Sequence, residues 1–321
     1  MKLPVERPLH PPATVSVAVV GICGAQHVER CLQSLARQLG APPFDVVVVH
    51  NPHLDDIEEL AQRWPKVRFA SNEGQRTPLE LASRALKEAR GEIVLLTEDH
   101  CVARPDWVRT LVQAHSEAGR SVVGGVVQIA SGASATDWAF YFVDFFRYAR
   151  PAQRGASPTL TVCNVSYKRE QLDAIRDVWE TYFHETAIHD ALRARFGELW
   201  LEPDAEVMTG RHVEFGHAIY ERYAFGRLFG CTRLLFAPHK RLFYCVFAPA
   251  LPLILIGRMA RKALGARLLA RDFLRSLGPL TAMALWWSWG EWVGYLTQRH
   301  PGSLVVAPEI RVARRGRGAA E

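Results

Sequence analysis

The stretch GEIVLLTEDHCVARPDW, residues 91–107, decides the expected fold. Its apolar part, residues 93–96, is a short run bounded by turn signals, which is typical of a strand buried on both faces of a parallel sheet. Glu98, Asp99 and His100 follow at once, and a new helix is expected after Pro105. In open α/β sheets ligands bind at the carboxyl ends of the strands, so this polar turn is the first candidate for a site.

Three neighbouring side chains with oxygen or nitrogen donors suit a divalent cation such as Mn²⁺ or Mg²⁺. Residues i and i+2 at a strand end point the same way, so Glu98 and His100 are the predicted metal ligands. A second interpretation is a polar strand end that caps the next helix, and the spacing alone fits both.

The rest of the N-terminal half alternates strands with helices. Strands are expected at residues 15–22, 44–49, 67–70 and 121–129, and helices at 26–39, 55–64 and 79–89. This order predicts an α/β fold with a mostly parallel sheet and helices on both faces. The first strand is not followed by GxGxxG, and the chain has no GxxxxGK[ST], which argues against a dinucleotide-binding fold and a P-loop NTPase.

Composition narrows the function classes further. The chain has 321 residues, 22% charged and 49% hydrophobic, which is enough for a large core. The net charge of +6 is not gathered into a basic stripe, so no nucleic-acid partner is expected. The 6 cysteines form no CxxC pair, so the spacing indicates neither a zinc site nor a disulfide framework. No signal peptide is recognised, and a cytosolic compartment is expected.

A resemblance now emerges from the motifs. An Asn72-x-Gly74 loop, the Ala89-x-Gly91-Glu92 segment and the acidic triplet resemble the nucleotide-sugar domain of family 2 glycosyltransferases of the membrane-associated bacterial type. That family has the GT-A fold, and the similarity covers roughly residues 14–210. The resemblance implies that the family's Asp-x-Asp metal motif falls on residues 98–100, with a histidine in place of the second aspartate.

The resemblance also implies the donor and acceptor contacts. The expected nucleotide-sugar-binding residues are His50, Asn51, Asp55, Gly74, Arg76 and Asp99, although the family has an aspartate where this chain has residues 50–51. Asn164 and Ser166 match a segment beside the family's acceptor site. Glu185 is the implied catalytic base, Asp190 is the next carboxylate, and His189 shares a helix face with Glu185 as a further acceptor contact.

The C-terminal third differs in character. Residues 242–257 are apolar but contain Pro249 and Pro252, residues 258–275 read as a basic amphipathic helix, and residues 277–296 are apolar and tryptophan-rich. Basic amphipathic helices with tryptophan lie in the membrane interface. Two full spans would carry the arginine-rich segment to the far side, against the positive-inside tendency. We therefore expect peripheral or re-entrant attachment at the cytoplasmic face; the alternative is a helical subdomain or a dimer interface.

The expected organisation is an irregular lead-in at residues 1–13, a GT-A domain at 14–215, a helical membrane-associated region at 216–300 and a disordered basic tail at 301–321. The implied reaction is inverting transfer from a UDP- or GDP-sugar to a lipid-linked or polysaccharide hydroxyl. The altered metal motif keeps a second class open, an inactive GT-A-like binding or scaffold protein. A nucleotidyltransferase is disfavoured because residues 21–27, GICGAQH, lack Lys and Arg.

Overall fold

The computed structural model describes residues 14–52, 54, 56–71, 74, 76–116, 120–265 and 269–299. The predictions for residues 1–13, Asp55 and residues 301–321 lie outside these ranges. The strands are β1 (Val15–Gly21), β2 (Phe44–His50), β3 (Arg68–Ser71), β4 (Ile93–Glu98), β5 (Cys101–Ala103), β6 (Val122–Ile129), β7 (Gly155–Ser157), β8 (Val165–Lys168) and β9 (Leu199–Thr209).

The helices of the N-terminal two thirds are α1 (Ala25–Ala36), α2 (Ile57–Arg63), α3 (Pro78–Glu88), α4 (Trp107–Ser116), α5 (Ala135–Phe145), α6 (Arg169–Asp173), α7 (Arg176–Trp179) and α8 (Glu185–Phe196). The C-terminal helices are α9 (Phe215–Phe236), α10 (Arg241–Phe247), α11 (Leu251–Gly265) and α12 (Ala270–Thr297), with the 3₁₀ turns η1 (Pro238–Lys240) and η2 (Ala248–Ala250).

The described strands form one nine-stranded sheet in the order β3-β2-β1-β4-β8-β6-β9-β5, with β7 paired to β9. β1 runs parallel to β2 and β4, β2 to β3, and β6 to β9. β8 is antiparallel between β4 and β6, and β5 and β7 are antiparallel to β9. The prediction of a mostly parallel α/β sheet is therefore confirmed.

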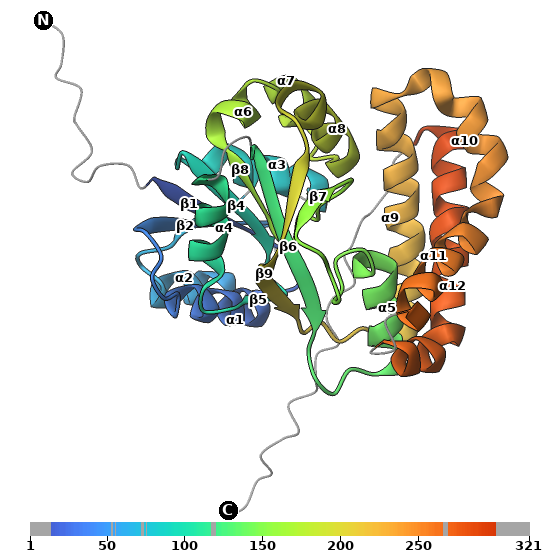
Figure 1. The fold of residues 1–321 in the computed structure, drawn as a ribbon, viewed down its shortest axis with the longest axis horizontal. Helices are drawn as coiled ribbons and strands as arrows, with labels where there is room; N and C mark the ends of the chain where they lie inside the picture. The colour runs from blue at the N-terminus through green and yellow to red at the C-terminus, as the bar shows by residue number, and fades with distance from the viewer. Residues whose placement is uncertain are drawn as a thin grey trace, which may run out of the picture.

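Alternate residues of β1 enter two separate cores, which is why helices cover both faces of the sheet. Val17 and Val19 pack with α1 and α4, whereas Ala18 and Val20 pack with α3 and α8. Figure 1 shows α1 and α2 on one side of the sheet and α6, α7 and α8 on the other. β4, the strand predicted from residues 93–96, is buried on both faces, because Val94, Leu95 and Leu96 are all inaccessible to solvent.

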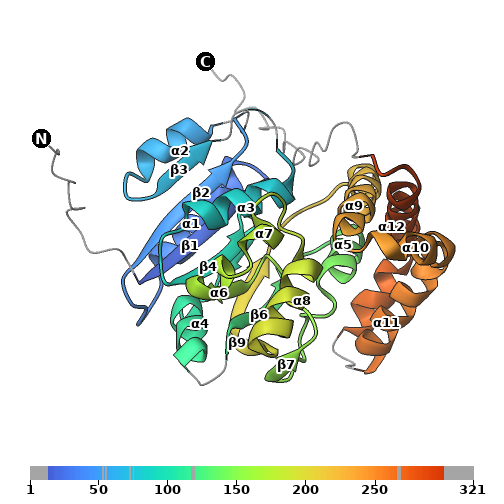
Figure 2. The same ribbon diagram turned by 90° about the horizontal axis from the view of Figure 1, so that it is seen from above.

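The C-terminal helices stand together beside the α/β part, next to α5 (Figures 1 and 2). α9 and α12 approach to backbone contact through glycines four residues apart, namely Gly226 and Gly230 on α9 and Gly290 and Gly294 on α12. A Cβ at Gly290 would lie 2.1 Å from the carbonyl oxygen of Tyr223. Small residues at this spacing let two helices pack closely. The tryptophan-rich segment is therefore a packed helix on one side, with Trp286 and Trp289 exposed on the other.

Two predictions about this region need correction. The basic segment 258–275 is not one helix, because α11 ends at Gly265 and α12 begins at Ala270. The apolar segment is also longer than the sequence pattern suggested, since η1, α10, η2 and α11 join into one helical run. Within the described residues, Pro238–Gly265 is long and apolar enough to cross a membrane by length and composition, with a mean hydropathy of 1.8 and 17% of its apolar window buried.

Candidate active site

The carboxyl end of β4 carries the polar turn that the sequence singled out. Glu98 is the last residue of β4, and Asp99 and His100 form the turn before β5. The Oδ2 atom of Asp99 accepts hydrogen bonds from three consecutive backbone N–H groups, those of residues 22–24, at 2.9, 2.7 and 3.3 Å. Asp99 thus fixes the turn between β1 and α1, and its side chain is buried away from the cavity described next.

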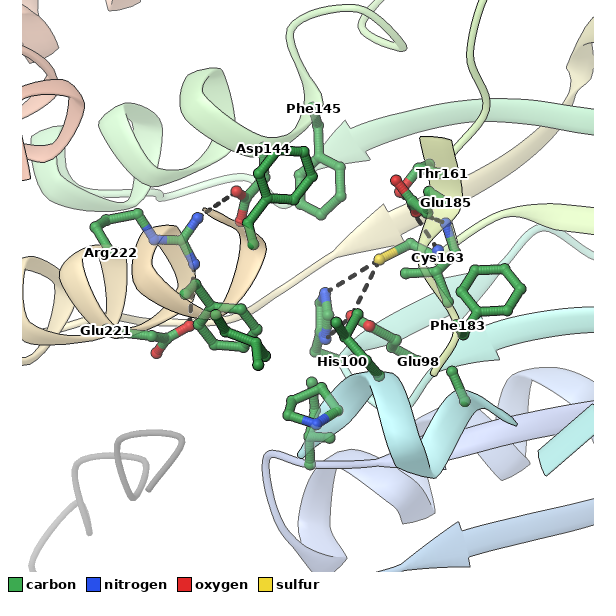
Figure 3. Close-up of a pocket in the computed structure, with 18 of the residues that line it drawn as sticks. Glu98, His100, Asp144, Phe145, Thr161, Cys163, Phe183, Glu185, Glu221 and Arg222 are labelled. Atoms are coloured by element: carbon green, nitrogen blue, oxygen red, sulfur yellow. Dashed lines mark hydrogen bonds and ion pairs between the residues drawn. The ribbon is translucent and has the colours of Figure 1, made fainter. Parts of the chain in front are cut away.

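A cavity of about 210 Å³ opens in front of this turn. Its walls come from the end of β4, the loop before β8, the start of α8, and helices α5, α9 and α12. The ionisable side chains that line it are Glu98, His100, Asp144, Cys163, His184, Glu185, Arg211, Glu221 and Arg222. Figure 3 shows Glu98, His100, Cys163 and Glu185 on one wall and Asp144, Glu221 and Arg222 on the opposite wall. Segments far apart in the sequence therefore bring these ionisable side chains to one cavity.

The predicted metal ligands do face the same cavity. The Oε2 atom of Glu98 lies 3.5 Å from Nδ1 of His100, and the side chains are only 13% and 6% exposed. Cys163 donates its thiol to Oε2 of Glu98 at 3.1 Å. Burial raises the pKa of Glu98 to about 7, because the ionised carboxylate loses its hydration there.

The predicted base, Glu185, is the first residue of α8 and lines the same cavity as Cys163. Its Oε1 atom accepts the backbone N–H of Val162, which holds the carboxylate in place. Burial raises the pKa of Glu185 to about 7. Asp190 lies one turn further along α8, but its side chain is exposed and paired with Arg193 at 3.0 Å. The structure therefore separates the two carboxylates, and only Glu185 lines the cavity.

His184 is a site residue that the sequence analysis missed. It lines the cavity beside Glu185 and is 2% exposed. Its ring stacks on Phe229 of α9 with 4.9 Å between centroids, and within the described residues neither ring nitrogen has a hydrogen-bond partner. Burial lowers the pKa of His184 to about 4, so the imidazole is neutral at pH 7. A neutral, unpaired imidazole offers one donor and one acceptor to a ligand in the cavity.

The opposite wall is a buried ionic network. The guanidinium of Arg211 donates to Glu221 at 2.8 and 2.5 Å, and Arg222 bonds both Glu221, at 3.1 Å, and Asp144. Both guanidinium groups lie over the ring of Phe140, at 5.0 and 4.1 Å from its centroid. Nε of Arg222 is buried without a partner in the described part of the chain. The sequence analysis did not identify Asp144, Arg211 or Glu221 as site residues.

The predicted nucleotide contacts lie outside the cavity lining. His50, at the end of β2, is buried, and its Nδ1 lies 2.9 Å from the carbonyl oxygen of Asn51. The side-chain amide of Asn51 is bound to the backbone of Arg76, with hydrogen bonds of 3.0 and 2.8 Å. Gly74 adopts a φ of +82°, which favours glycine. The structure thus joins the loops after β2 and β3, and Arg76 pairs with Glu80 at 3.4 Å.

The three predicted acceptor contacts are side chains of the core. Asn164 receives the indole N–H of Trp107 at 2.8 Å, and its amide donates to backbone carbonyls of residues 126 and 205. Ser166 donates to the carbonyl of residue 123, and His189 lies 3.1 Å from the hydroxyl of Tyr167. All three are fully or almost fully buried and do not line the cavity. The structure uses their polar atoms within the fold and does not bring these three side chains to the cavity.

The mostly parallel sheet, with a cavity lined by ionisable residues at the carboxyl end of β4, defines a protein of the GT-A glycosyltransferase fold. Solved structures share this fold at low identity. The mannosyltransferase PcManGT from Pyrobaculum calidifontis, in complex with GDP-Man and Mn²⁺, is 17% identical with a TM-score of 0.52, over 90% of this chain and 86% of that one. S. aureus TarS 1–349 in complex with UDP-GlcNAc is 15% identical with a TM-score of 0.51, over 84% and 90%.

Residues 19–176, about half of the chain, match the profile of glycosyl transferase family 2. The family assignment predicted from the sequence is therefore confirmed. The comparison with curated proteins found no match. The family match indicates a glycosyltransferase.

Proposed function

We propose that this chain is an inverting glycosyltransferase that moves a sugar from a nucleoside-diphosphate donor to an acceptor hydroxyl, with a divalent cation held at Glu98 and His100. The observation that carries the proposal is that Glu98, His100 and Glu185 line one cavity, although they come from the end of β4, the turn after it and the start of α8. Such convergence of ionisable groups with raised carboxyl pKa values is typical of an active site.

The residues fit a divalent cation such as Mn²⁺ or Mg²⁺. Four carboxylates, those of Glu98, Asp144, Glu185 and Glu221, line the cavity, whereas Arg211 and Arg222 are the only guanidinium groups among its described lining residues. A cation beside Glu98 would offset this excess of negative charge and lower the carboxyl pKa that burial has raised. When bound, it would neutralise charge that develops on the diphosphate leaving group.

Glu185 is the proposed base. Its Oε1 atom is occupied by the N–H of Val162, which leaves Oε2 to take the proton from the acceptor hydroxyl. The hydroxyl oxygen then attacks the anomeric carbon from the side opposite the diphosphate, and this single displacement inverts the configuration. A base with a pKa near 7 is well matched to this task at neutral pH.

The ligands named for the structural neighbours, GDP-Man with PcManGT and UDP-GlcNAc with TarS, support a nucleotide-sugar donor. Within the cavity, Arg222 is suited to the donor phosphates because its buried Nε has no other partner in the described residues. Calorimetric titration of UDP and of GDP, with and without Mn²⁺, tests the proposal. Binding of one nucleotide that requires the ion supports it, whereas no binding with any divalent ion contradicts it and favours the scaffold function.

We further propose that the acceptor is lipid-linked and that the C-terminal helices attach to the cytoplasmic face of the membrane. The surface of Pro238–Gly265 exposes large apolar side chains, among them Leu253 at 78%. Arg258 and Arg261 on α11 are exposed beside it, and Arg271 and Arg275 are exposed near the start of α12. An apolar surface rimmed by basic residues suits a bilayer with anionic headgroups.

Alkaline carbonate extraction tests whether this attachment is peripheral. Release into the soluble fraction supports attachment in the membrane plane, and retention with integral proteins contradicts it. Flotation with anionic vesicles tests the surface itself. Leu253→Glu should reduce co-flotation, whereas Leu39→Glu should not, because Leu39 is similarly exposed, at 64%, but follows α1 on the α/β part. Equal flotation of both variants would remove the C-terminal surface from consideration.

A further inference from the structure

Two buried thiols lie beside the proposed cation site. Sγ of Cys163 is 3.8 Å from Nε2 of His100 and 3.1 Å from Oε2 of Glu98. Cys101, the first residue of β5, lies on the same side: the ligand atoms of His100, Cys101 and Cys163 are all within 4.8 Å of one another. All three residues are more than nine-tenths buried, and His100 and Cys163 also line the cavity.

The backbone fixes this arrangement. β8 pairs antiparallel with β4, so that Leu96 lies opposite Val165, and the loop before β8 is carried to the end of β4. The hydroxyl of Thr97 donates to the carbonyl oxygen of Cys163 at 2.8 Å, which ties the two segments at the point where the thiol emerges. Cys101 follows His100 directly in the chain. The cluster is therefore a product of the sheet register rather than of flexible surface side chains.

We propose that this chain binds a thiophilic divalent cation, Zn²⁺ in the first place, through Nε2 of His100 and the thiolates of Cys101 and Cys163. The inference rests on the proposed function but revises its cation: His100 stays a ligand, Zn²⁺ takes the place of Mn²⁺ or Mg²⁺, and Glu98 orients the histidine instead of binding the metal. One imidazole and two thiolates are a ligand set typical of zinc, and three protein ligands leave a fourth position open. Mg²⁺ instead requires six oxygen ligands in octahedral geometry, which this cluster does not supply.

Glu98 has a defined place in this arrangement. Its Oε2 is 3.5 Å from Nδ1 of His100, the ring nitrogen that faces away from Cys163. A carboxylate beside Nδ1 favours the tautomer that carries the proton on this nitrogen, which leaves Nε2 free to bind the metal. The open fourth position would face the cavity, which His100 and Cys163 line. Each thiol loses its proton to solvent as its sulfur–metal bond forms, so binding should release protons.

Cobalt substitution tests the ligand set directly. Metal-free protein titrated with Co²⁺ should develop the near-ultraviolet sulfur-to-cobalt charge-transfer absorption, and Zn²⁺ should abolish it by displacement. Cys163→Ser should lose most of this absorption and weaken Zn²⁺ binding by at least about 10–100-fold, the loss known for an outer partner of a metal ligand. Cys245→Ser is the matched control, because Cys245 lies on α10 outside the cluster, and it should behave as wild type.

Zinc X-ray absorption of the wild-type protein gives the same answer without any variant, so a misfolded variant cannot obscure it. Sulfur neighbours around zinc support the inference, and nitrogen and oxygen neighbours alone overturn it. Nucleotide titration separates this outcome from the proposed function. Mn²⁺-dependent nucleotide binding without sulfur ligation would leave the function standing and remove the thiolate site. If zinc is bound by sulfur but no nucleotide binds, whichever divalent ion is added, the thiolate site stands and the proposed function is contradicted.

Discussion

Replacing Glu185 with glutamine removes the proposed base while keeping the shape of the site. The glutamine amide has the same length, and its oxygen still accepts the N–H of Val162 that Glu185 now holds. A positioned general base contributes about 10²–10⁴-fold to a rate. We therefore expect Glu185→Gln to lower the rate of sugar transfer by about that factor, with nucleotide binding unchanged, because the base acts on the acceptor.

The pH dependence gives a second readout of the same residue. Burial raises the pKa of Glu185 to about 7, so the proton-accepting form is scarce below this pH and dominant above it. The value of kcat/KM should consequently rise with pH through about 7 and then level off. Glu98 has a similarly raised pKa, so the profile is measured at saturating divalent cation, which holds the Glu98 carboxylate ionised. Glu185→Gln should lack the rising limb.

Asp190→Asn is the matched control, a carboxyl-to-amide change on the same helix. Asp190 is exposed and paired with Arg193, so its loss should leave both the rate and the pH profile as in the wild type. The assay is transfer of radiolabelled sugar from the donor that calorimetry identifies. Near-normal turnover of Glu185→Gln, or an unchanged rising limb, would refute the assignment of Glu185 as the base.

Three further outcomes follow from the geometry. Glu98→Ala should weaken both metal-dependent nucleotide binding, measured by calorimetry, and transfer; unchanged binding would place the cation elsewhere. Gly290→Ala should lower thermal stability by about 1–3 kcal/mol through overpacking, since its Cβ would lie 2.1 Å from a carbonyl oxygen of α9, whereas Gly257→Ala meets nothing within 4 Å and should not destabilise. His184→Phe keeps a ring to stack on Phe229 and should raise one substrate KM by about 2–10-fold, as expected for one lost hydrogen bond; an unaltered KM for both substrates would exclude a ligand contact.

The parallel part of the fold was predictable because each apolar run carries its own signal. Residues 93–96 are flanked by turns and fully apolar, and they do form β4, buried on both faces. The cluster around His100 was not predictable in this way. Cys101 and Cys163 are far apart in the sequence and match no zinc-ligand spacing, so their approach depends on the antiparallel register of β4 and β8.

Other site residues could not be predicted from the sequence for a different reason. Asp144 lies in a segment that its aromatic neighbours mark as apolar. Arg211 and Glu221 are ten residues apart, in the loop before α9 and on α9, and their spacing carries no signal of the ion pair. Asn164 and Ser166 show the opposite case: a motif match suggested acceptor contacts, but a motif match says nothing of which way a buried side chain points. One signal was readable: the GxxxG spacings at residues 226–230 and 290–294 mark the two surfaces through which α9 and α12 meet.

The position of the cavity connects the proposed sugar transfer with the proposed membrane attachment. Glu98 and Glu185 belong to the α/β part, whereas Arg222 comes from α9 and Trp287 from α12, and all four line the same space. α12 also packs against α10, η2 and α11, the helices that carry the exposed apolar surface. A site built at this junction is incomplete without the C-terminal helices. The segment proposed to meet the bilayer, Pro238–Gly265, packs against α12, and α12 forms a wall of the cavity, so under this proposal a lipid-linked acceptor would approach Glu185 past α12.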